Sequence, residues 1–341
     1  MPPGNVLGNR LNFPGWILIY RRRTQPNGAR RSSTGWVEQL PGTSLALSAA
    51  IQNLDPAHDT YPFPGLCPQR TVRCWMTAFL LDMDGVLHHG ERVLAGALEF
   101  VQRISDSKHL FVTNNPVRSP GLVAQQLSSL GFKGIVASQI LTSAQATAAW
   151  LARQKPGFHY FAVGADGLHD ALSEVGTEDR RNADYVVIGE GAGLDYESLT
   201  IGLNLVLGGA TLVATNPDAN VDAWRDGRQL VLPGGGALVA PFEVAAGQKA
   251  IVIGKPYPLL YRMAMERLGV GVDDCIMIGD RPDTDIAGAA ALGMRSALVR
   301  TGRFLPGASW PKGMDKPGWD VDSLAELTSE FEAAGILQVF S

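Results

Sequence analysis

Two aspartates separated by a single residue, Asp82 and Asp84, follow the apolar run Phe79–Leu81 and precede Gly85. Such a run is typical of a buried parallel strand, and the carboxyl ends of these strands face the crevice where open α/β sheets bind ligands. Two carboxylates there can hold a divalent cation while one oxygen stays free to attack a substrate. The glycine lets the backbone turn tightly and approach an anion closely. Asp and Gly also form ordinary turns, so the pair alone does not decide between a turn and a site.

Three further apolar segments end in polar residues that suit a phosphate site. The first ends in Thr113 and Asn114, whose hydroxyl and following backbone N–H can bind phosphate oxygens, although these residue types favour a helix N-cap equally. The second ends in Lys255, a point charge suited to a phosphoryl group. The third carries Asp280 and Asp285, and Mg²⁺ prefers carboxylate oxygens. Each signal is weak alone, but together the four strand ends predict a Mg²⁺-phosphate site.

In their order along the chain, these residues resemble the motifs of the haloacid dehalogenase (HAD)-like hydrolase superfamily. The motifs are Asp82-Met83-Asp84-Gly85-Val86, Thr113-Asn114-Asn115, Gly254-Lys255-Pro256, and Gly279-Asp280 with Thr284-Asp285. The resemblance covers roughly residues 78–305. It implies an α/β fold with a doubly wound parallel sheet core and an inserted α/β cap domain. It also implies a phosphatase that acts on a small phosphate ester, because the true dehalogenases of the superfamily lack the second aspartate.

The resemblance implies a role for each motif residue. Asp82 is expected to be the nucleophile that forms an aspartyl-phosphate, and Asp84 the general acid/base that protonates the leaving oxygen and then activates water. The phosphoryl group is expected to be held by Gly85, Thr113, Asn114 and Lys255. The cofactor Mg²⁺ is expected to be held by Asp82, the backbone carbonyl of Asp84, and Asp280, with Asp285 supporting these ligands.

Apolar and amphipathic segments alternate from residue 76 onward, which predicts parallel strands joined by right-handed crossovers. The expected strands are 78–82, 109–113, 134–137, 160–163, 184–189, 210–215, 250–254, 274–279 and 295–300. The expected helices include 94–105, 119–130, 256–268 and 283–292. A glycine stands just past three of these helices, as is common at helix C-termini: Gly131, Gly269 and Gly293.

The spacing of the motifs predicts the position of a second domain. Thr113 and Lys255 lie 142 residues apart, far more than one crossover needs, so the residues near 143–245 are expected to form a cap that excludes water and reads the leaving group. A cap in this position resembles the NagD-type branch (subfamily IIA), which includes p-nitrophenyl, phosphoglycolate, pyridoxal, nucleotide and sugar phosphatases. Asn216 and Asp218 are expected to line the cleft, although turn formation explains them as well. The branch is also compatible with a homodimer formed through the cap.

The expected domains are an N-terminal extension (1–75), a discontinuous core (76–142 and 246–310), the cap (143–245) and a C-terminal tail with a helix (311–341). The extension is rich in Pro, Gly, Arg and Ser and lacks helical or strand periodicity, which is typical of a disordered segment. Because Met76 directly precedes the first strand, our hypothesis is that the extension is a mis-annotated upstream stretch. Two interpretations compete with it: organelle targeting by the arginines, and binding of an acidic surface such as nucleic acid or a membrane.

Composition narrows the functional classes. Residues 1–75 carry eight arginines and three acidic residues, so the rest of the chain is acidic, which disfavours nucleic-acid binding by the folded part. No apolar run is long enough to predict a membrane helix. The three cysteines form neither a metal-ligand spacing nor a disulfide framework. The chain is therefore expected to be a cytoplasmic protein with a small-molecule substrate.

Two other functions use the same aspartyl-phosphate chemistry. A phosphotransferase or mutase would pass the phosphoryl group to a second hydroxyl, and a receiver-like signalling module would keep it on Asp82. The long cap insertion disfavours the receiver. The adjacent pair His88-His89 does not chelate a metal easily, so we interpret both histidines as solvent-facing loop residues.

Overall fold

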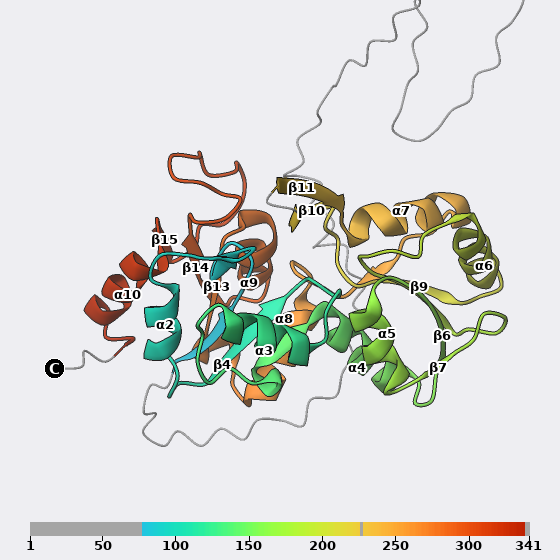
Figure 1. The fold of residues 1–341 in the computed structure, drawn as a ribbon, viewed down its shortest axis with the longest axis horizontal. Coiled ribbons are helices and arrows are strands. Elements are labelled where there is room, and N and C mark those ends of the chain that lie inside the picture. Colours follow the sequence, from blue (N-terminus) through green and yellow to red (C-terminus); the bar gives the residue numbers. More distant parts are fainter. Residues whose placement is uncertain (1–76, 226–227, 338–341) are drawn as a thin grey trace, which may run out of the picture. The chain divides into compact units, whose positions relative to one another are not determined.

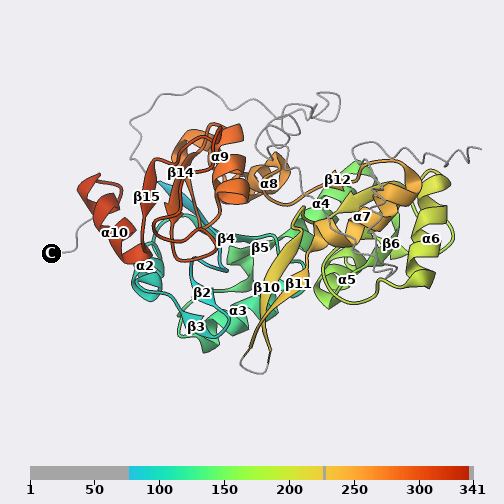
Figure 2. The ribbon, with the colours of Figure 1, turned by 90° about the horizontal axis from the view of Figure 1, so that it is seen from above.

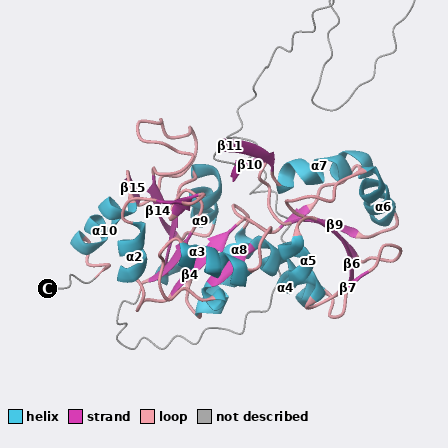
Figure 3. Cartoon of the chain, in the orientation of Figure 1, coloured by secondary structure: helices cyan, strands magenta, loops and turns pink. Residues whose placement is uncertain are grey.

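The computed structural model describes residues 77–225 and 228–337 (Figure 1). The prediction for residues 1–75 therefore falls outside the described residues. Helices and strands alternate along most of the chain (Figure 3), and both large sheets are entirely parallel. The predicted α/β class with a parallel sheet is confirmed.

The first sheet has six strands in the order β15-β14-β13-β1-β4-β5. Their bounds are β1 (Ala78–Leu81), β4 (His109–Thr113), β5 (Ile140–Thr142), β13 (Cys275–Gly279), β14 (Arg295–Val299) and β15 (Trp319–Val321). From β1 the chain proceeds outward through β4 and β5, and it later returns to the other side of β1 through β13. The strand order therefore reverses between β1 and β13, which is where open α/β sheets place their ligands.

Both faces of the first sheet are covered because its strands are apolar on both sides. Phe79 and Leu81 belong to one buried cluster, whereas Leu80 belongs to another, as the alternation of side chains along a strand requires. Figure 2 shows helices on both sides of the sheet. One side carries α2 (Ala97–Arg103) and α3 (Pro120–Ser129), and the other carries α8 (Pro258–Leu268) and α9 (Ala287–Ala291). Helix α10 (Leu324–Ala333) packs near α2, where Phe331 stacks on Phe79.

The second sheet has five strands in the order β12-β9-β8-β6-β7. Their bounds are β6 (His159–Val163), β7 (Thr177–Glu178), β8 (Tyr185–Ile188), β9 (Thr211–Ala214) and β12 (Ile251–Val252). The helices that accompany them are α4 (Ser143–Gln154), α5 (Asp166–Ser173), α6 (Tyr196–Leu207) and α7 (Gly235–Ala246). One buried cluster includes residues of both sheets, such as Leu110 of β4 and Tyr160 of β6, so the two sheets share a continuous apolar core.

Two hairpins form separate two-stranded sheets outside the two large ones. One pairs β2 (His88–His89) with β3 (Arg92–Val93), and the other pairs β10 (Asn220–Arg225) with β11 (Arg228–Pro233). Neither hairpin was expected from the sequence. Two-residue strands carry too little alternation to be recognised, and β10 is rich in polar residues.

Several predicted elements differ from the structure. The strand expected at 134–137 is wrong: this stretch is largely exposed and leads into the 3₁₀ turn η2 (Ala137–Gln139), and the strand that pairs with β4 is β5. The helix expected at 283–292 begins as the π-helical turn η4 (Pro282–Ile286). A further 3₁₀ turn, η3 (Val272–Asp274), precedes β13. The three predicted glycine C-termini are confirmed, since each adopts a positive φ.

The strand expected at 250–254 exists as β12, but it pairs with β9 and so belongs to the second sheet. This sheet therefore includes a strand beyond residue 245, whereas the domain boundaries themselves stay a prediction. Among the described residues, none of the helices is both long and apolar enough to span a membrane.

Candidate active site

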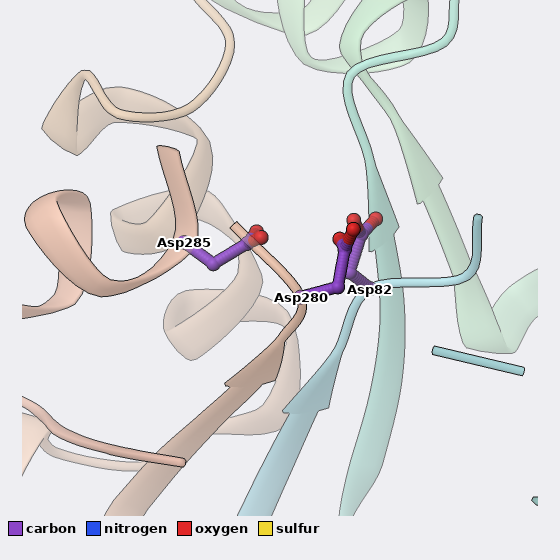
Figure 4. A group of neighbouring side chains, drawn as sticks. All are labelled: Asp82, Asp280 and Asp285. Carbon is purple, nitrogen blue, oxygen red and sulfur yellow. The ribbon is translucent and has the colours of Figure 1, made fainter. Parts of the chain in front are cut away.

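The candidate site lies beyond the carboxyl ends of β1 and β13. Asp82 directly follows β1, and its backbone N–H donates to the carbonyl of Ile278 at 2.9 Å. Asp280 directly follows β13. Because β1 and β13 are parallel neighbours, the two aspartates leave the sheet side by side, and Figure 4 shows Asp285 pointing toward them from η4. All three side chains are buried.

Lys255 supplies the positive charge at this position. Its side chain is 2% exposed, and its Nζ lies 2.9 Å from Asp82 Oδ1 and 2.7 Å from Asp285 Oδ1. The same ammonium donates to the carbonyl of Val112 at 3.3 Å. Burial acts to lower the pKa of Lys255, but the carboxylates of Asp285 and Asp82 outweigh it and raise that pKa. Lys255 is therefore a fixed cation that bridges two carboxylates.

Asn114 holds the backbone of Lys255 in place. Its Oδ1 accepts the N–H of Lys255 at 2.7 Å, and its Nδ2 donates to the carbonyl of Lys255 at 2.9 Å. The same Nδ2 donates to Asp218 Oδ2 at 2.9 Å. The side-chain amide of Asn114 is thus used inside the protein, and it connects the lysine to the loop that follows β9.

Three carboxylates form a cluster that suits a metal ion. One oxygen each from Asp82, Asp280 and Asp285 lies within 4.8 Å of the others. Asp280 Oδ1 is buried and has no hydrogen-bond partner among the described residues, whereas its Oδ2 accepts the N–H of Arg303 at 2.9 Å. A buried carboxylate oxygen without a partner is costly unless a cation binds it. The donor set therefore fits a hard divalent cation such as Mg²⁺.

Glycines leave the space that Asp280 needs. A Cβ on Gly302 would lie 1.8 Å from Asp280 Oδ2, and a Cβ on Gly85 would lie 2.6 Å from the same oxygen. Gly85 also adopts a φ of +85°, which side-chain-bearing residues rarely adopt. Both positions therefore require glycine, and the predicted turn function of Gly85 includes making room for the carboxylate.

The carboxylate cluster carries more negative than positive charge. Burial, together with the neighbouring carboxylates of Asp285 and Asp82, raises the pKa of Asp280 well above its ordinary value. Burial also raises the pKa of Asp82 and that of Asp285, the latter to about 6, and Lys255 opposes both shifts. One lysine cannot neutralise three buried carboxylates, so a bound cation would lower these pKa values and stabilise the fold.

Thr113 and Asp84 complete the predicted set. Thr113 is buried at the end of β4, and its Oγ1 accepts the N–H of Asn115 at 3.1 Å. The side chain of Asp84 is 64% exposed and faces the cleft. An acid/base group needs access to the leaving oxygen and to water, and the exposure of Asp84 allows both.

These residues line one cavity of about 150 Å³. Its wall joins the strand ends of the first sheet to loops of the second domain. The lining residues are Asp82, Asp84, Gly85, His89, Gly90, Thr113, Asn114, Asn115, Glu190, Asp218, Asn220, Val221, Asp222, Lys255, Asp280, Arg281, Thr284 and Arg303. The structure thus brings every predicted core-motif residue to the same cavity, apart from Asp285, which lies behind Lys255.

Known proteins are similar to this chain in sequence and in structure. A family model for haloacid dehalogenase-like hydrolases matches residues 79–178, and a HAD-hydrolase-like model matches residues 252–327. The 5′-nucleotidase YutF of Bacillus subtilis (strain 168) is 34% identical over 251 residues, which cover 73% of this chain and 96% of that protein. The chain belongs to the HAD-like hydrolase family.

Two further relatives identify the branch of this HAD hydrolase. The acid sugar phosphatase of Staphylococcus aureus (strain USA300) is 35% identical over 229 residues, which cover 66% of this chain and 86% of that protein. The structure of NagD from E. coli K-12 is 29% identical, with a TM-score of 0.66, and covers 74% of this chain and 98% of that one. The predicted family, its NagD-type branch and the enzyme class, a HAD phosphatase, are confirmed.

The two predicted cap residues occupy different places in the HAD hydrolase. Asp218 lines the cavity, where its Oδ1 accepts from Arg281 Nη1 at 2.5 Å. Asn216 is fully buried and does not line the cavity. Its Nδ2 donates to Glu190 Oε1 at 2.8 Å and to the carbonyl of Asn114 at 2.9 Å. Asn216 therefore supports the cavity wall, and the expectation that it lines the cleft is wrong.

Two arginines that sequence reasoning missed connect the metal-site carboxylates to the cap loops. The backbone N–H of Arg281 donates to Asp285 Oδ2 at 3.1 Å, while its guanidinium pairs with Asp218. The backbone N–H of Arg303 donates to Asp280, and its Nε pairs with Asp222 Oδ2 at 2.8 Å. Each arginine thus donates its backbone N–H to the carboxylate cluster and pairs its side chain with an aspartate of the cap.

Glu190 is a third residue that sequence reasoning missed. It follows β8, is only 3% exposed and lines the cavity. Burial raises the pKa of Glu190 to about 7, Asn216 opposes this shift by donating a hydrogen bond, and the charges of Asp218 and Asp84 add to it. The sequence did hold a signal for Glu190, namely a carboxylate between two glycines just past an apolar strand. This pattern partly matches Gly279-Asp280, where a carboxylate also follows a glycine.

Glu190→Gln should alter the pH dependence of stability. Because the folded-state pKa of Glu190 is about 7 and its ordinary value is 4.5, its contribution to stability is full below pH 4.5 and is lost as the pH rises through 7. Glutamine does not ionise, so relative to wild type the variant should gain about 3 kcal/mol in unfolding free energy between pH 4.5 and 8.5. Urea unfolding at both pH values, in EDTA, measures this gain.

The exposed residue Glu174 provides the control. The difference between Glu174→Gln and wild type should be the same at both pH values. An unchanged difference between Glu190→Gln and wild type from pH 4.5 to 8.5 would contradict the assignment of a raised pKa to Glu190.

Proposed function

We propose that this HAD phosphatase hydrolyses the phosphomonoester of a small metabolite through an aspartyl-phosphate on Asp82, with Mg²⁺ as cofactor. The observation that carries the proposal is the position of the buried Asp82 carboxylate. It pairs with Lys255 and belongs to the same carboxylate cluster as Asp280. The charge of Lys255, together with that of the proposed Mg²⁺, would let this carboxylate approach a phosphate dianion despite its own charge.

In the first step, an oxygen of Asp82 forms a bond to phosphorus while the bond from phosphorus to the ester oxygen breaks. Asp84 donates its proton to that departing oxygen, so the product alcohol leaves neutral. In the second step, water attacks the phosphorus and gives a proton to Asp84, and the bond to Asp82 breaks. Phosphate is released and both aspartates return to their starting states.

The remaining residues position the phosphoryl group. Lys255 carries the charge that opposes the phosphoryl oxygens, and the hydroxyl of Thr113 offers a hydrogen-bond donor at the same end of the cavity, where Gly85 has no side chain to keep those oxygens away from the backbone. Asp82, Asp280 and the carbonyl of Asp84 would hold Mg²⁺, with Asp285 behind them. When bound, Mg²⁺ supplies charge neutralisation for the phosphoryl oxygens.

The substrate class remains the set that the branch implies: a sugar phosphate, phosphoglycolate, a nucleotide or pyridoxal phosphate. The relatives support this range, since one is named a 5′-nucleotidase and another an acid sugar phosphatase. A panel of these esters, scored by released phosphate, identifies the preferred one. Accumulation of a phosphorylated second product in place of free phosphate would support a phosphotransferase or mutase, and a stable phosphoprotein without turnover would support a receiver-like module.

Metal removal should stop turnover. EDTA should reduce phosphate release from p-nitrophenyl phosphate to background, because the carboxylate cluster then repels the substrate, and excess Mg²⁺ should restore it. Mg²⁺ at about a hundred times its Kd should also stabilise the folded protein by about 2.7 kcal/mol. Thermal unfolding with and without Mg²⁺ measures this effect independently of activity.

Asp280→Asn is the matched variant for this test. It removes the charge of the carboxylate whose Oδ1 has no partner among the described residues, so the Mg²⁺-dependent rise in melting temperature should shrink sharply. Full activity in EDTA, or an equal rise in both proteins, would contradict the proposed metal site.

A further inference from the structure

His88 is buried against the proposed acid/base residue. Its exposure is 5%, and its Nδ1 has no hydrogen-bond partner among the described residues. Asp84 Oδ1 lies 3.9 Å from this nitrogen. The prediction that both histidines are solvent-facing loop residues is therefore wrong for His88.

The hairpin of β2 and β3 fixes the backbone of His88. Gly85 donates its N–H to the carbonyl of His88 at 2.9 Å, and His88 pairs with Val93 across the hairpin. The neighbouring His89 turns the other way, and its Nε2 lies 2.8 Å from the carbonyl of Thr301. Successive side chains of a strand point to opposite sides, so only His88 is aimed at Asp84.

The carboxylate of Asp84 is the available acceptor for the Nδ1–H of His88. It is largely exposed, and among the described residues it has an ion-pair contact with His88 alone. A buried N–H without an acceptor is unfavourable, and an unrestrained aspartate can rotate by about 1 Å to accept it, since catalytic hydrogen bonds in unliganded structures are often long and shorten in the complex.

We propose that His88 is a positioning residue for Asp84. The neutral imidazole donates its Nδ1–H to Asp84 Oδ1 and leaves the other carboxyl oxygen to carry the proton toward the departing ester oxygen. This role rests on the proposed function, in which Asp84 is the general acid. It requires no charge change of His88, only a donor at the Nδ1 position.

The role predicts a loss that depends on the leaving group. Adenosine 5′-phosphate and glucose 6-phosphate are esters of primary alcohols, whose oxygens need a proton to depart. p-Nitrophenolate is a stable anion and needs little assistance. His88→Leu should therefore lower kcat/KM about 10- to 100-fold for the primary-alcohol ester that is hydrolysed best, and less than about threefold for p-nitrophenyl phosphate. The parameter kcat/KM reports the step that breaks the ester bond.

Four variants separate a positioning role of His88 from a purely structural one. His88→Asn places an amide N–H near the Nδ1 position and should recover most of the lost kcat/KM, whereas His88→Gln places its amide farther out and should not. His109 is another buried histidine and lies at the end of β4 opposite to Thr113. His109→Leu should therefore leave the ratio of kcat/KM between the two esters unchanged. Combining His88→Leu with Asp84→Asn should add no further selective loss.

The outcomes distinguish the two levels of the proposal. Equal losses on both kinds of ester, or recovery in none of the His88 variants, would overturn the role of His88 while the phosphatase function stands. If the wild-type protein releases phosphate from no ester, the proposed function fails and the role fails with it. A selective loss with rescue by asparagine supports both.

Discussion

Asp82→Asn should abolish phosphate release, lowering kcat by about 10³-fold or more, because the amide cannot form the acyl phosphate. The side chain keeps its size, so the buried position beside Lys255 stays filled. The measurement is phosphate release from p-nitrophenyl phosphate and from the best metabolite ester in excess Mg²⁺. Acid quenching of the wild-type reaction with ³²P-labelled substrate should trap label on the protein, and the variant should carry none.

The exposed residue Asp106 provides a matched control. Asp106→Asn makes the same chemical change far from the carboxylate cluster and should keep the wild-type rate. Retention of more than a few per cent of activity by Asp82→Asn would refute the nucleophile assignment, and label trapped on that variant would do the same.

Lys255→Met should damage both activity and stability. The variant keeps the apolar stem but removes the cation that bridges Asp82 and Asp285, so kcat should fall about 10²- to 10³-fold. Two buried carboxylates then lack their partner, which should cost about 3–5 kcal/mol of unfolding free energy near neutral pH. Steady-state kinetics and urea unfolding measure the two effects.

The stability loss should depend on pH in a defined direction. The pKa of Asp285 is already raised to about 6 beside the lysine, and without Lys255 it should rise further. A carboxyl with a raised folded-state pKa loses stability as the pH rises, so the deficit of Lys255→Met should be largest above pH 7 and smallest near pH 5. A deficit that does not change with pH would contradict the charge-based explanation.

The exposed residue Lys249 supplies the control for this variant. It is 86% exposed at its side chain and pairs with Glu243. Because such surface pairs contribute little, Lys249→Met should change stability by less than about 1 kcal/mol and should leave kcat unchanged.

Much of this site could be predicted from the sequence because its chemistry sits at strand ends. An apolar run of four or five residues followed by a polar one marks both the strand and its exit, as at Asp82 and Asp280. Parallel strands bring their exits to one edge of a sheet. Residues nearly 200 positions apart could therefore be expected to meet.

Other parts could not be read from the sequence because they depend on which elements become neighbours. The run at 134–137 has a strand-like composition, yet β5 pairs with β4 in its place. Burial of His88 depends on the β2–β3 hairpin, and that of Glu190 on the loop after β9 through Asn216. Arg281 and Arg303 are ordinary surface residue types whose partners lie 63 and 81 positions away. Pairing over such distances leaves no local pattern.

The placement of β12 has a consequence for how separable the two halves of the molecule are. Lys255 lies three residues after Val252, the last residue of β12, and among the described strands β12 pairs with β9 alone, in the second sheet. Deleting residues 143–245 would leave β12 in the chain but would remove β9, the strand with which β12 pairs. We therefore expect that a chain lacking residues 143–245 loses the pairing that holds the strand before Lys255, even where the first sheet still folds.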